Sequence, residues 1–171
     1  MTDPADREIV FRPATEADEV AICDLINSRE ELFLVYPGGR FPLTPRQLRE
    51  LAQCRRALTV GETSTGIVAF ANLYNFIDAQ HAFIGNLIVA RHWRGRGVGR
   101  ALLAHMVHLA GEEYGLEEVR ISVFADNTPA VLLYAAEGFL PFDVEERRDP
   151  DGHRRALLHM QKCLTRAQQH E

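Results

Sequence analysis

The sequence predicts a mixed α/β domain, with a mostly antiparallel sheet of about seven strands flanked by four helices. Strand-like and helix-like segments follow one another in the order β α α β β β α β α β β. The three consecutive strands in the middle are joined by turns too short for a crossover helix, which favours an antiparallel meander. With 171 residues, 46% of them hydrophobic, the chain is long enough to bury one core.

Each segment carries its own local signal. Strands show apolar runs between turn residues, and helices repeat apolar residues every three to four positions. Pro13 ends the first strand in a way that suits a sheet edge, and Thr44-Pro45-Arg46-Gln47 is a helix start with a capping box. The expected elements are strand 9–12, helix 15–29, helix 44–52, strands 57–61, 66–77 and 81–90, helix 98–113, strand 119–124, helix 127–137, and a closing hairpin of 139–146 with 156–163.

Residues 27–41 contain the longest expected connection. This segment is apolar and rich in aromatic residues, and Pro37-Gly38-Gly39 interrupts it. Such a connection is either a lid over a ligand or a tightly packed loop, and the sequence leaves both interpretations open.

Composition limits the class of protein. The net charge is −5 and the pI is near 5.8, so we expect no general attraction to nucleic acid or to anionic membranes. The three cysteines are far apart and form no C-x-x-C pair, which is typical of reduced thiols. The first residues are acidic, and no apolar run reaches the ~18 residues of a membrane helix. We therefore expect a cytoplasmic protein with one domain at 8–163 and flexible tails at 1–7 and 164–171.

The segment from Leu87 to Arg100 runs from a strand through an Arg/Gly loop directly into a helix. Its glycines let backbone N–H groups approach a ligand without an intervening Cβ atom. The N-terminus of the helix adds a partial positive charge. Such a loop is typical of a phosphate-binding site.

Other readings of this loop fit less well. A dinucleotide fingerprint fails because Arg100 or Leu102 stands where its third glycine is needed, and a Walker loop fails because the chain has no Gly-Lys-Ser/Thr. A tight turn between solvated arginines is the plain structural alternative. RNA binding is weaker still, since no stacking aromatic residues are interleaved with the arginines.

Two blocks of sequence together carry a family resemblance. Arg94-Gly95-Arg96-Gly97-Val98-Gly99 matches the Q/R-x-x-G-x-G/A pyrophosphate loop of the GNAT acetyltransferases. Residues 123–139 resemble a later motif of that family, in which an Asn opens a helix that ends in Tyr-x-x-x-Gly-Phe. The chain is thus similar to a bacterial-type, single-domain member of the GNAT superfamily of acetyl-CoA-dependent N-acetyltransferases.

The resemblance implies that acetyl-CoA binds where two parallel strands splay apart. Asn127 would contact the cofactor near the splay, and Tyr134 would protonate the leaving thiolate as a general acid. The pantetheine arm would lie along the backbone of Leu87, Ile88 and Val89, and the pyrophosphate would be held by Arg94, Gly95, Arg96, Gly97, Val98, Gly99 and Arg100.

The implied reaction is direct attack of a neutral amine on the acetyl thioester, with no covalent enzyme intermediate and no metal. The acceptor would be a primary amine of a small molecule or of a peptide. The alternative is a non-catalytic acyl-CoA-binding sensor or regulatory domain. A homodimer is compatible with both readings, and we expect neither nucleic acid nor membrane as a partner.

One part of the family pattern is missing. Many GNAT enzymes carry a Glu on the strand before the loop, whereas residues 82–86 of this chain read Ala-Phe-Ile-Gly-Asn. An alkylamine with a pKa near 10.4 is almost wholly protonated near neutral pH, so a base is required. The candidates that remain are Asp78, His81, Glu30, Glu31 and a water chain to solvent.

Overall fold

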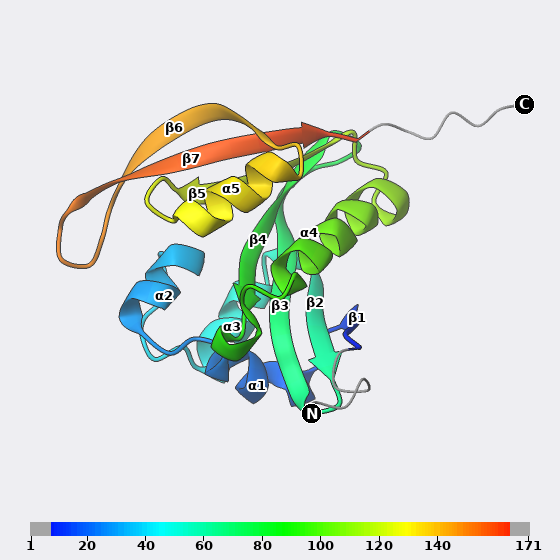
Figure 1. The fold of residues 1–171 in the computed structure, drawn as a ribbon, viewed down its shortest axis with the longest axis vertical. Coiled ribbons are helices and arrows are strands. Elements are labelled where there is room, and N and C mark those ends of the chain that lie inside the picture. Colours follow the sequence, from blue (N-terminus) through cyan, green and yellow to red (C-terminus); the bar gives the residue numbers. More distant parts are fainter. Residues whose placement is uncertain (1–7, 165–171) are drawn as a thin grey trace, which may run out of the picture.

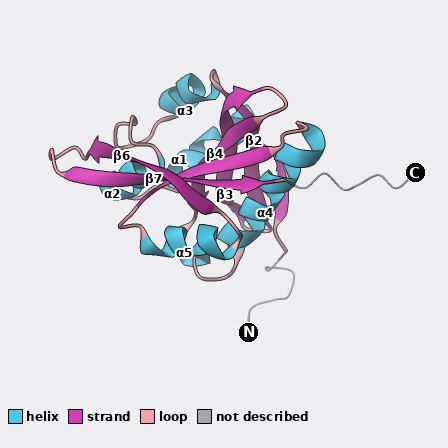
Figure 2. Cartoon of the chain, turned by 90° about the horizontal axis from the view of Figure 1, so that it is seen from above, coloured by secondary structure: helices cyan, strands magenta, loops and turns pink. Residues whose placement is uncertain are grey.

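The computed structural model describes residues 8–164 (Figure 1). A curved sheet runs through the middle of the molecule, and helices lie on both of its faces, as the view from above also shows (Figure 2). The elements are β1 (Val10–Pro13), η2 (Glu16–Asp18), α1 (Glu19–Asp24), α2 (Arg29–Val35), α3 (Pro45–Ala52), β2 (Arg55–Thr63), β3 (Gly66–Ile77), β4 (His81–Val89), η3 (Arg91–Trp93), α4 (Val98–His108), η4 (Leu109–Glu113), β5 (Glu118–Phe124), α5 (Thr128–Ala136), β6 (Leu140–Arg148) and β7 (Arg154–Cys163).

The sheet has seven strands in the order β1-β2-β3-β4-β5-β7-β6. All neighbouring pairs are antiparallel except β4 and β5, which run parallel. The crossover between β4 and β5 is made by α4, as a parallel pair requires. The predicted fold class, including the antiparallel meander of β2, β3 and β4, is confirmed.

Apolar side chains pack on both faces of the sheet. The larger core lies under α4 and α5, where Leu102, Leu103 and Met106 contact the inward side chains of the central strands. The second core lies under α1, α2 and α3 and includes Ile22 and Leu48. Each strand in the middle of the sheet therefore has apolar residues on both faces. A polar side chain on one of these strands thus indicates a specific structural or functional role.

Three details differ from the sequence-based expectations. The helix expected at 15–29 is a 3₁₀ turn followed by the short helix α1, and Val20, expected on its apolar face, is 62% exposed. The segment 27–41, expected to be irregular, contains the helix α2. Ser28 caps this helix by accepting a hydrogen bond from the backbone N–H of Glu31. Residues 8–164 thus hold five α-helices instead of four.

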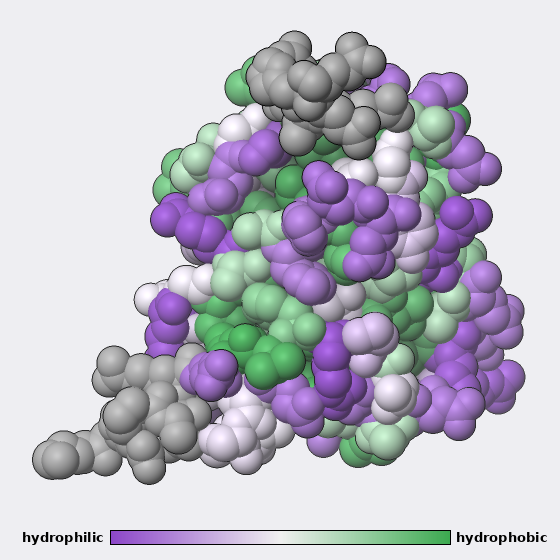
Figure 3. Space-filling model, turned by 90° about the vertical axis from the view of Figure 1, so that its right-hand side faces the viewer, coloured by the Kyte–Doolittle hydropathy of each residue, from purple (hydrophilic) through white to green (hydrophobic). Residues whose placement is uncertain are grey.

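The surface carries both hydrophilic and hydrophobic side chains. On the side where β1 forms the edge of the sheet, hydrophilic side chains surround a smaller gathering of hydrophobic ones (Figure 3). No helix of residues 8–164 has the length and apolar character needed to cross a membrane. The division into one domain at 8–163 with tails stays a prediction, and residues 1–7 and 165–171 lie outside the described part of the chain.

Candidate functional site

The two parallel strands separate at a defined point. Pairing between β4 and β5 runs from His81–Glu118 to Ile84–Ile121 and then stops, although both strands continue. β4 stays paired with β3 as far as Val89, and a bulge around Asn86, which has a positive φ of 49°, lies in this stretch. The edge of β4 that faces β5 is therefore free from Gly85 onward, which is where the pantetheine arm is expected.

The loop after β4 leads into the N-terminus of α4. Gly95 and Gly97 have φ values of 71° and 83°, and Gly97 is the N-cap of the helix. A Cβ atom on either glycine would meet no atom of residues 8–164 within 4 Å, so among these residues open space lies beside this backbone. Val98 is buried and anchors the helix start in the core. The geometry thus suits an anion held by backbone N–H groups at a helix N-terminus.

The arginines of this loop are already partly engaged. Arg94 donates from Nε to the carbonyl oxygen of Val89 at 2.9 Å and from Nη1 to Glu31 at 3.1 Å. Arg100 pairs with Glu137 at 2.7 Å, and Arg96 lies over the ring of Trp93. We expected these three arginines to surround the phosphates, and the structure gives each of them a protein partner as well.

Glu31 joins α2 to the phosphate loop. Its carboxylate accepts hydrogen bonds from Arg91, Arg94 and the backbone N–H of Asn27. Burial alone would raise the pKa of Glu31, but these hydrogen bonds and the nearby positive charges outweigh it and lower the pKa to about 2. Glu31 is therefore ionised at neutral pH and engaged in ion pairs with Arg91 and Arg94, which makes it unsuitable as the missing base.

Two residues of the later motif face the opening between β4 and β5. The side-chain amide of Asn127 does not cap α5 and has no hydrogen-bond partner among residues 8–164. Tyr134 is buried, its hydroxyl also lacks a partner among those residues, and it lines the central cavity. Burial raises the pKa of Tyr134, so the phenol keeps its proton at neutral pH and can serve as a proton donor but not as a phenolate base.

Two cavities meet in this region. One of about 230 Å³ lies between α2 and α5, and it is lined by Leu87, Ile88, Val89, Arg94 and Asn127, together with Glu31 and Pro129 among others. The other, of about 440 Å³, lies beyond the splay under the C-terminal end of α2. Five of the eleven predicted cofactor residues thus line the first cavity, residues 95–100 do not line it, and Tyr134 lines the second.

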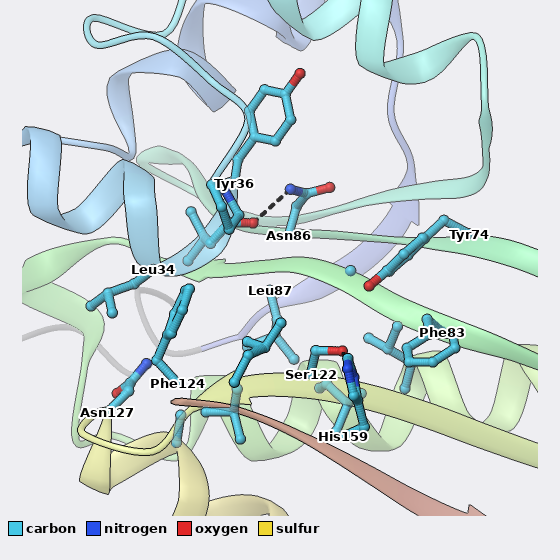
Figure 4. A pocket seen from close by; sticks show the side chains of 18 of the residues that line it. Leu34, Tyr36, Tyr74, Phe83, Asn86, Leu87, Ser122, Phe124, Asn127 and His159 are labelled. Atoms are coloured by element: carbon cyan, nitrogen blue, oxygen red, sulfur yellow. Dashed lines mark hydrogen bonds between the residues drawn. The ribbon is translucent and has the colours of Figure 1, made fainter. Parts of the chain in front are cut away.

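The larger cavity is lined by both polar and apolar side chains. Leu34, Phe124 and Asn127 lie at one end, and Tyr74, Phe83, Ser122 and His159 lie at the other (Figure 4). At its roof, Asn86 donates to the carbonyl oxygen of Val35 at 2.7 Å and accepts from Asn72 at 2.8 Å. Asn86, in the stretch of β4 that lacks a carboxylate, therefore holds the end of α2 in place. Arg55, Glu145 and Arg147 also line this cavity.

None of the bases considered from sequence lines this cavity. Asp78 is exposed at the turn before β4, and its carboxylate lies 3.7 Å from Arg56. His81 is at the first residue of β4, at the end away from the splay. Glu30 pairs with Arg155 at 3.2 Å. The polar strand residues that do line the cavity, Arg55, Ser122 and His159, were missed because the sequence does not reveal how their strands pair.

Comparison with known proteins gives a consistent result. The model of the acetyltransferase (GNAT) family matches residues 23–139. A phosphinothricin N-acetyltransferase of Streptomyces viridochromogenes is 28% identical over 142 residues, which cover 80% of this chain and 76% of that protein. A probable spermine N(1)-acetyltransferase of Bacillus subtilis subsp. natto is 25% identical over 138 residues, which cover 77% and 87%.

A solved structure agrees with these relatives. A GCN5-related N-acetyltransferase from Kribbella flavida superposes with a TM-score of 0.73 at 29% identity, over 91% of this chain and 98% of that one. Nothing in the comparisons supports the alternative of a non-catalytic sensor. The family match covers most of the chain and includes the phosphate loop and the splay. The chain belongs to the acetyltransferase (GNAT) family, as an enzyme that transfers an acetyl group from acetyl-CoA to an amine.

Proposed function

We propose that this enzyme acetylates a small-molecule amine that also carries an anionic group, such as the carboxylate of an amino acid. The observation behind this proposal is Arg55, which lines the larger cavity. Its Nε and Nη1 atoms are buried and have no hydrogen-bond partner within residues 8–164. The guanidinium lies over the ring of Tyr74, with its central carbon 3.9 Å from the ring centroid, and no carboxylate of residues 8–164 pairs with it.

An unpaired buried charge is costly, and a ligand that supplies the opposite charge recovers that cost. Arg147 adds a second guanidinium to the same cavity. Glu145, the acidic residue that lines the cavity, is already bonded to Arg147 at 2.5 Å and to His159 at 2.9 Å. The free charge presented to an acceptor is therefore positive.

This charge discriminates between the acceptors named for the relatives. Phosphinothricin is an amino acid with a phosphinate group, and its anionic groups suit Arg55. Spermine is a polycation and would be repelled by the same site. The volume of about 440 Å³ is also in the range of small-molecule sites. We therefore prefer a small amino-acid-like acceptor to a polyamine or to a peptide terminus.

The remaining residues receive roles that fit their positions. The free edge of β4 at Leu87–Val89 would hold the pantetheine arm, and the N–H groups from Gly95 to Arg100 would hold the pyrophosphate, with Arg94, Arg96 and Arg100 nearby. Asn127, which lines both cavities, would contact acetyl-CoA at their junction. When bound, acetyl-CoA supplies the thioester that the amine attacks. Tyr134 would donate a hydrogen bond to the sulfur as the thiolate leaves.

The test uses matched acceptors that differ only in the anion. Free thiol release from acetyl-CoA is measured with L-methionine, L-leucine and phosphinothricin, with the amides of the first two, and with spermine. We expect the acids to have the higher kcat/KM, and Arg55→Gln to lower it about 10- to 100-fold, the range for a lost hydrogen bond to a charged group. The matched control is Arg56→Gln, because Arg56 is the next residue and pairs with Asp78 outside the cavity.

Two results would contradict this proposal. One is a preference of the wild type for the amides or for spermine over the acids. The other is an equal loss in Arg55→Gln for acids and amides, since that would mean that Arg55 only supports the structure of the cavity. Acetyl-CoA affinity should be unchanged in both variants.

We place the enzyme in the cytoplasm and expect no nucleic-acid partner. A homodimer is supported by β6, an edge strand that exposes Leu140, Phe142 and Val144. Sedimentation of the purified chain would decide the oligomeric state.

A further inference from the structure

Three polar side chains on neighbouring strands form a hydrogen-bonded row at the wall of the larger cavity. Ser122 of β5 and His159 of β7 are direct register partners, and the Oγ of Ser122 lies 2.7 Å from the Nδ1 of His159. On the other side of the ring, Nε2 lies 2.9 Å from a carboxylate oxygen of Glu145 on β6. All three residues line the cavity.

The imidazole of His159 is held in place by aromatic neighbours. Phe83 of β4 meets the ring edge-on, with centroids 6.0 Å apart, and Phe142 of β6 lies at 6.1 Å. The His159 side chain is 15% exposed. The charged groups around it are Glu145, then Arg147, which pairs with that carboxylate, and Arg120 of β5, which lies over the ring of Phe142.

The hydrogen bonds fix the direction of proton movement. An ionised carboxylate only accepts hydrogen bonds, so in neutral His159 the proton is on Nε2 and faces Glu145. Nδ1 is then an acceptor, and the hydroxyl group of Ser122 donates a hydrogen bond to it. The lone pairs of the Ser122 oxygen remain available to accept a proton from a further donor.

Ser122 lies at the point where chemistry is expected. It is the first residue of β5 after the last residue paired with β4, so it stands where the two strands begin to separate. Ser122, His159 and Arg55 line the same cavity, and Tyr134 lines it as well (Figure 4 shows Ser122 and His159 side by side). An amine that enters this cavity and approaches the splay therefore passes Ser122.

We propose that Ser122 and His159, supported by Glu145, form the proton relay that deprotonates the acceptor amine. The ammonium N–H gives its proton to Ser122 Oγ as Ser122 gives its own proton to His159 Nδ1, and the imidazolium is stabilised by Glu145. The neutral amine then forms the C–N bond and the C–S bond breaks, while the nitrogen gives up a second proton that reaches the sulfur by way of Tyr134, so that CoA leaves as a thiol. The proton on His159 leaves to solvent, which accounts for the one proton released when an ammonium becomes an amide and CoA leaves as a thiol.

Ser122 is the member of the row that touches the substrate, and His159 and Glu145 act through it. The relay rests on the acetyl transfer established for the family and does not need the acceptor to be anionic. It supplies the base that the strand before the phosphate loop lacks in this chain, where Asn86 is bonded to Asn72 and to Val35 instead.

The kinetic test follows thiol release over a range of pH for wild type, Ser122→Ala and His159→Gln, with the acceptor of the matched panel that has the highest kcat/KM. We expect each variant to lose about 10²- to 10⁴-fold near pH 7, the usual range for a lost acid or base. The loss should shrink as the pH rises, because below its own pKa the amine becomes ten times more deprotonated in solution with each pH unit. His81→Gln is the control and should behave as wild type.

A second measurement needs no acceptor. The ¹⁵N chemical shifts of the His159 side chain report its tautomer, and we expect the Nε2–H form in the neutral ring. The opposite tautomer would overturn the relay, as would a loss in His159→Gln that is constant over pH, or full activity in Ser122→Ala. Failure of the anionic-acceptor proposal would instead appear in the wild type, as equal rates for acids and amides.

Discussion

Gly97 offers the sharpest test of how the phosphate loop binds acetyl-CoA. Its φ of 83° lies in the left-handed region, and a Cβ atom there would meet no atom of the described part of the chain within 4 Å. Gly97→Glu should therefore cost stability only through backbone strain, about 1–2 kcal/mol, or ~2–8 °C in Tm for a chain of this size. Gly115 has a φ of 60° with equally open space and lies away from both cavities, so Gly115→Glu is the matched control.

The two variants should differ only when acetyl-CoA is present. Ligand at one hundred times its Kd stabilises the folded state by about 2.7 kcal/mol, which raises Tm by ~5–11 °C. We expect wild type and Gly115→Glu to show this rise and Gly97→Glu to show none, because a side chain and a negative charge stand where the pyrophosphate meets the backbone. The measurement is a thermal melt with and without acetyl-CoA. A full rise in Gly97→Glu would refute the placement of the pyrophosphate at this loop.

Two further predictions concern Tyr134 and Glu31. Tyr134→Phe keeps the ring, so Tm and acetyl-CoA affinity should stay the same, while kcat falls by about 10²-fold or less because a thiolate is already a fair leaving group; unchanged turnover would remove Tyr134 from the mechanism. The pKa of Glu31 is lowered to about 2, so its stabilising effect is complete above the unfolded pKa and is lost as the pH falls toward 2. The Tm difference between wild type and Glu31→Gln should shrink over that range. A difference constant with pH would contradict the ion pairs of Glu31 with Arg91 and Arg94. The control is Glu30→Gln, at the neighbouring residue.

The sequence predicted the parts of the site that are local in the chain. The phosphate loop is a strand, a glycine turn and a helix start within residues 87–100, and Gly95 and Gly97 have a conformation that other residues rarely adopt. Asn127 directly precedes the short helix α5 and Tyr134 lies in it, so their spacing alone places them together. Such features depend on a few consecutive residues, and sequence patterns report them well.

The acceptor side of the site depends on long-range pairing and was not predicted. Ser122 and His159 are 37 residues apart and meet only because β7 pairs with β5 in a particular register. Arg55 precedes the strand expected at 57–61, and its burial follows from Tyr74 on the next strand. A charged or polar residue in a strand is usually solvated, so no single position marked these residues as functional.

The helix α2 links the two halves of the site. At its start, Glu31 bonds to Arg91 and Arg94 beside the phosphate loop, and at its end the carbonyl oxygen of Val35 accepts a hydrogen bond from Asn86 in the bulge of β4. Residues just after the helix, such as Tyr36, line the acceptor cavity. The alternatives of lid and packed connection therefore describe one segment, because Phe33 stacks on Phe124 in a buried contact while the end of the helix forms the wall of the cavity. The two ends of α2 are thus attached to the two halves of the site, the start through Arg91 and Arg94 and the end through Asn86.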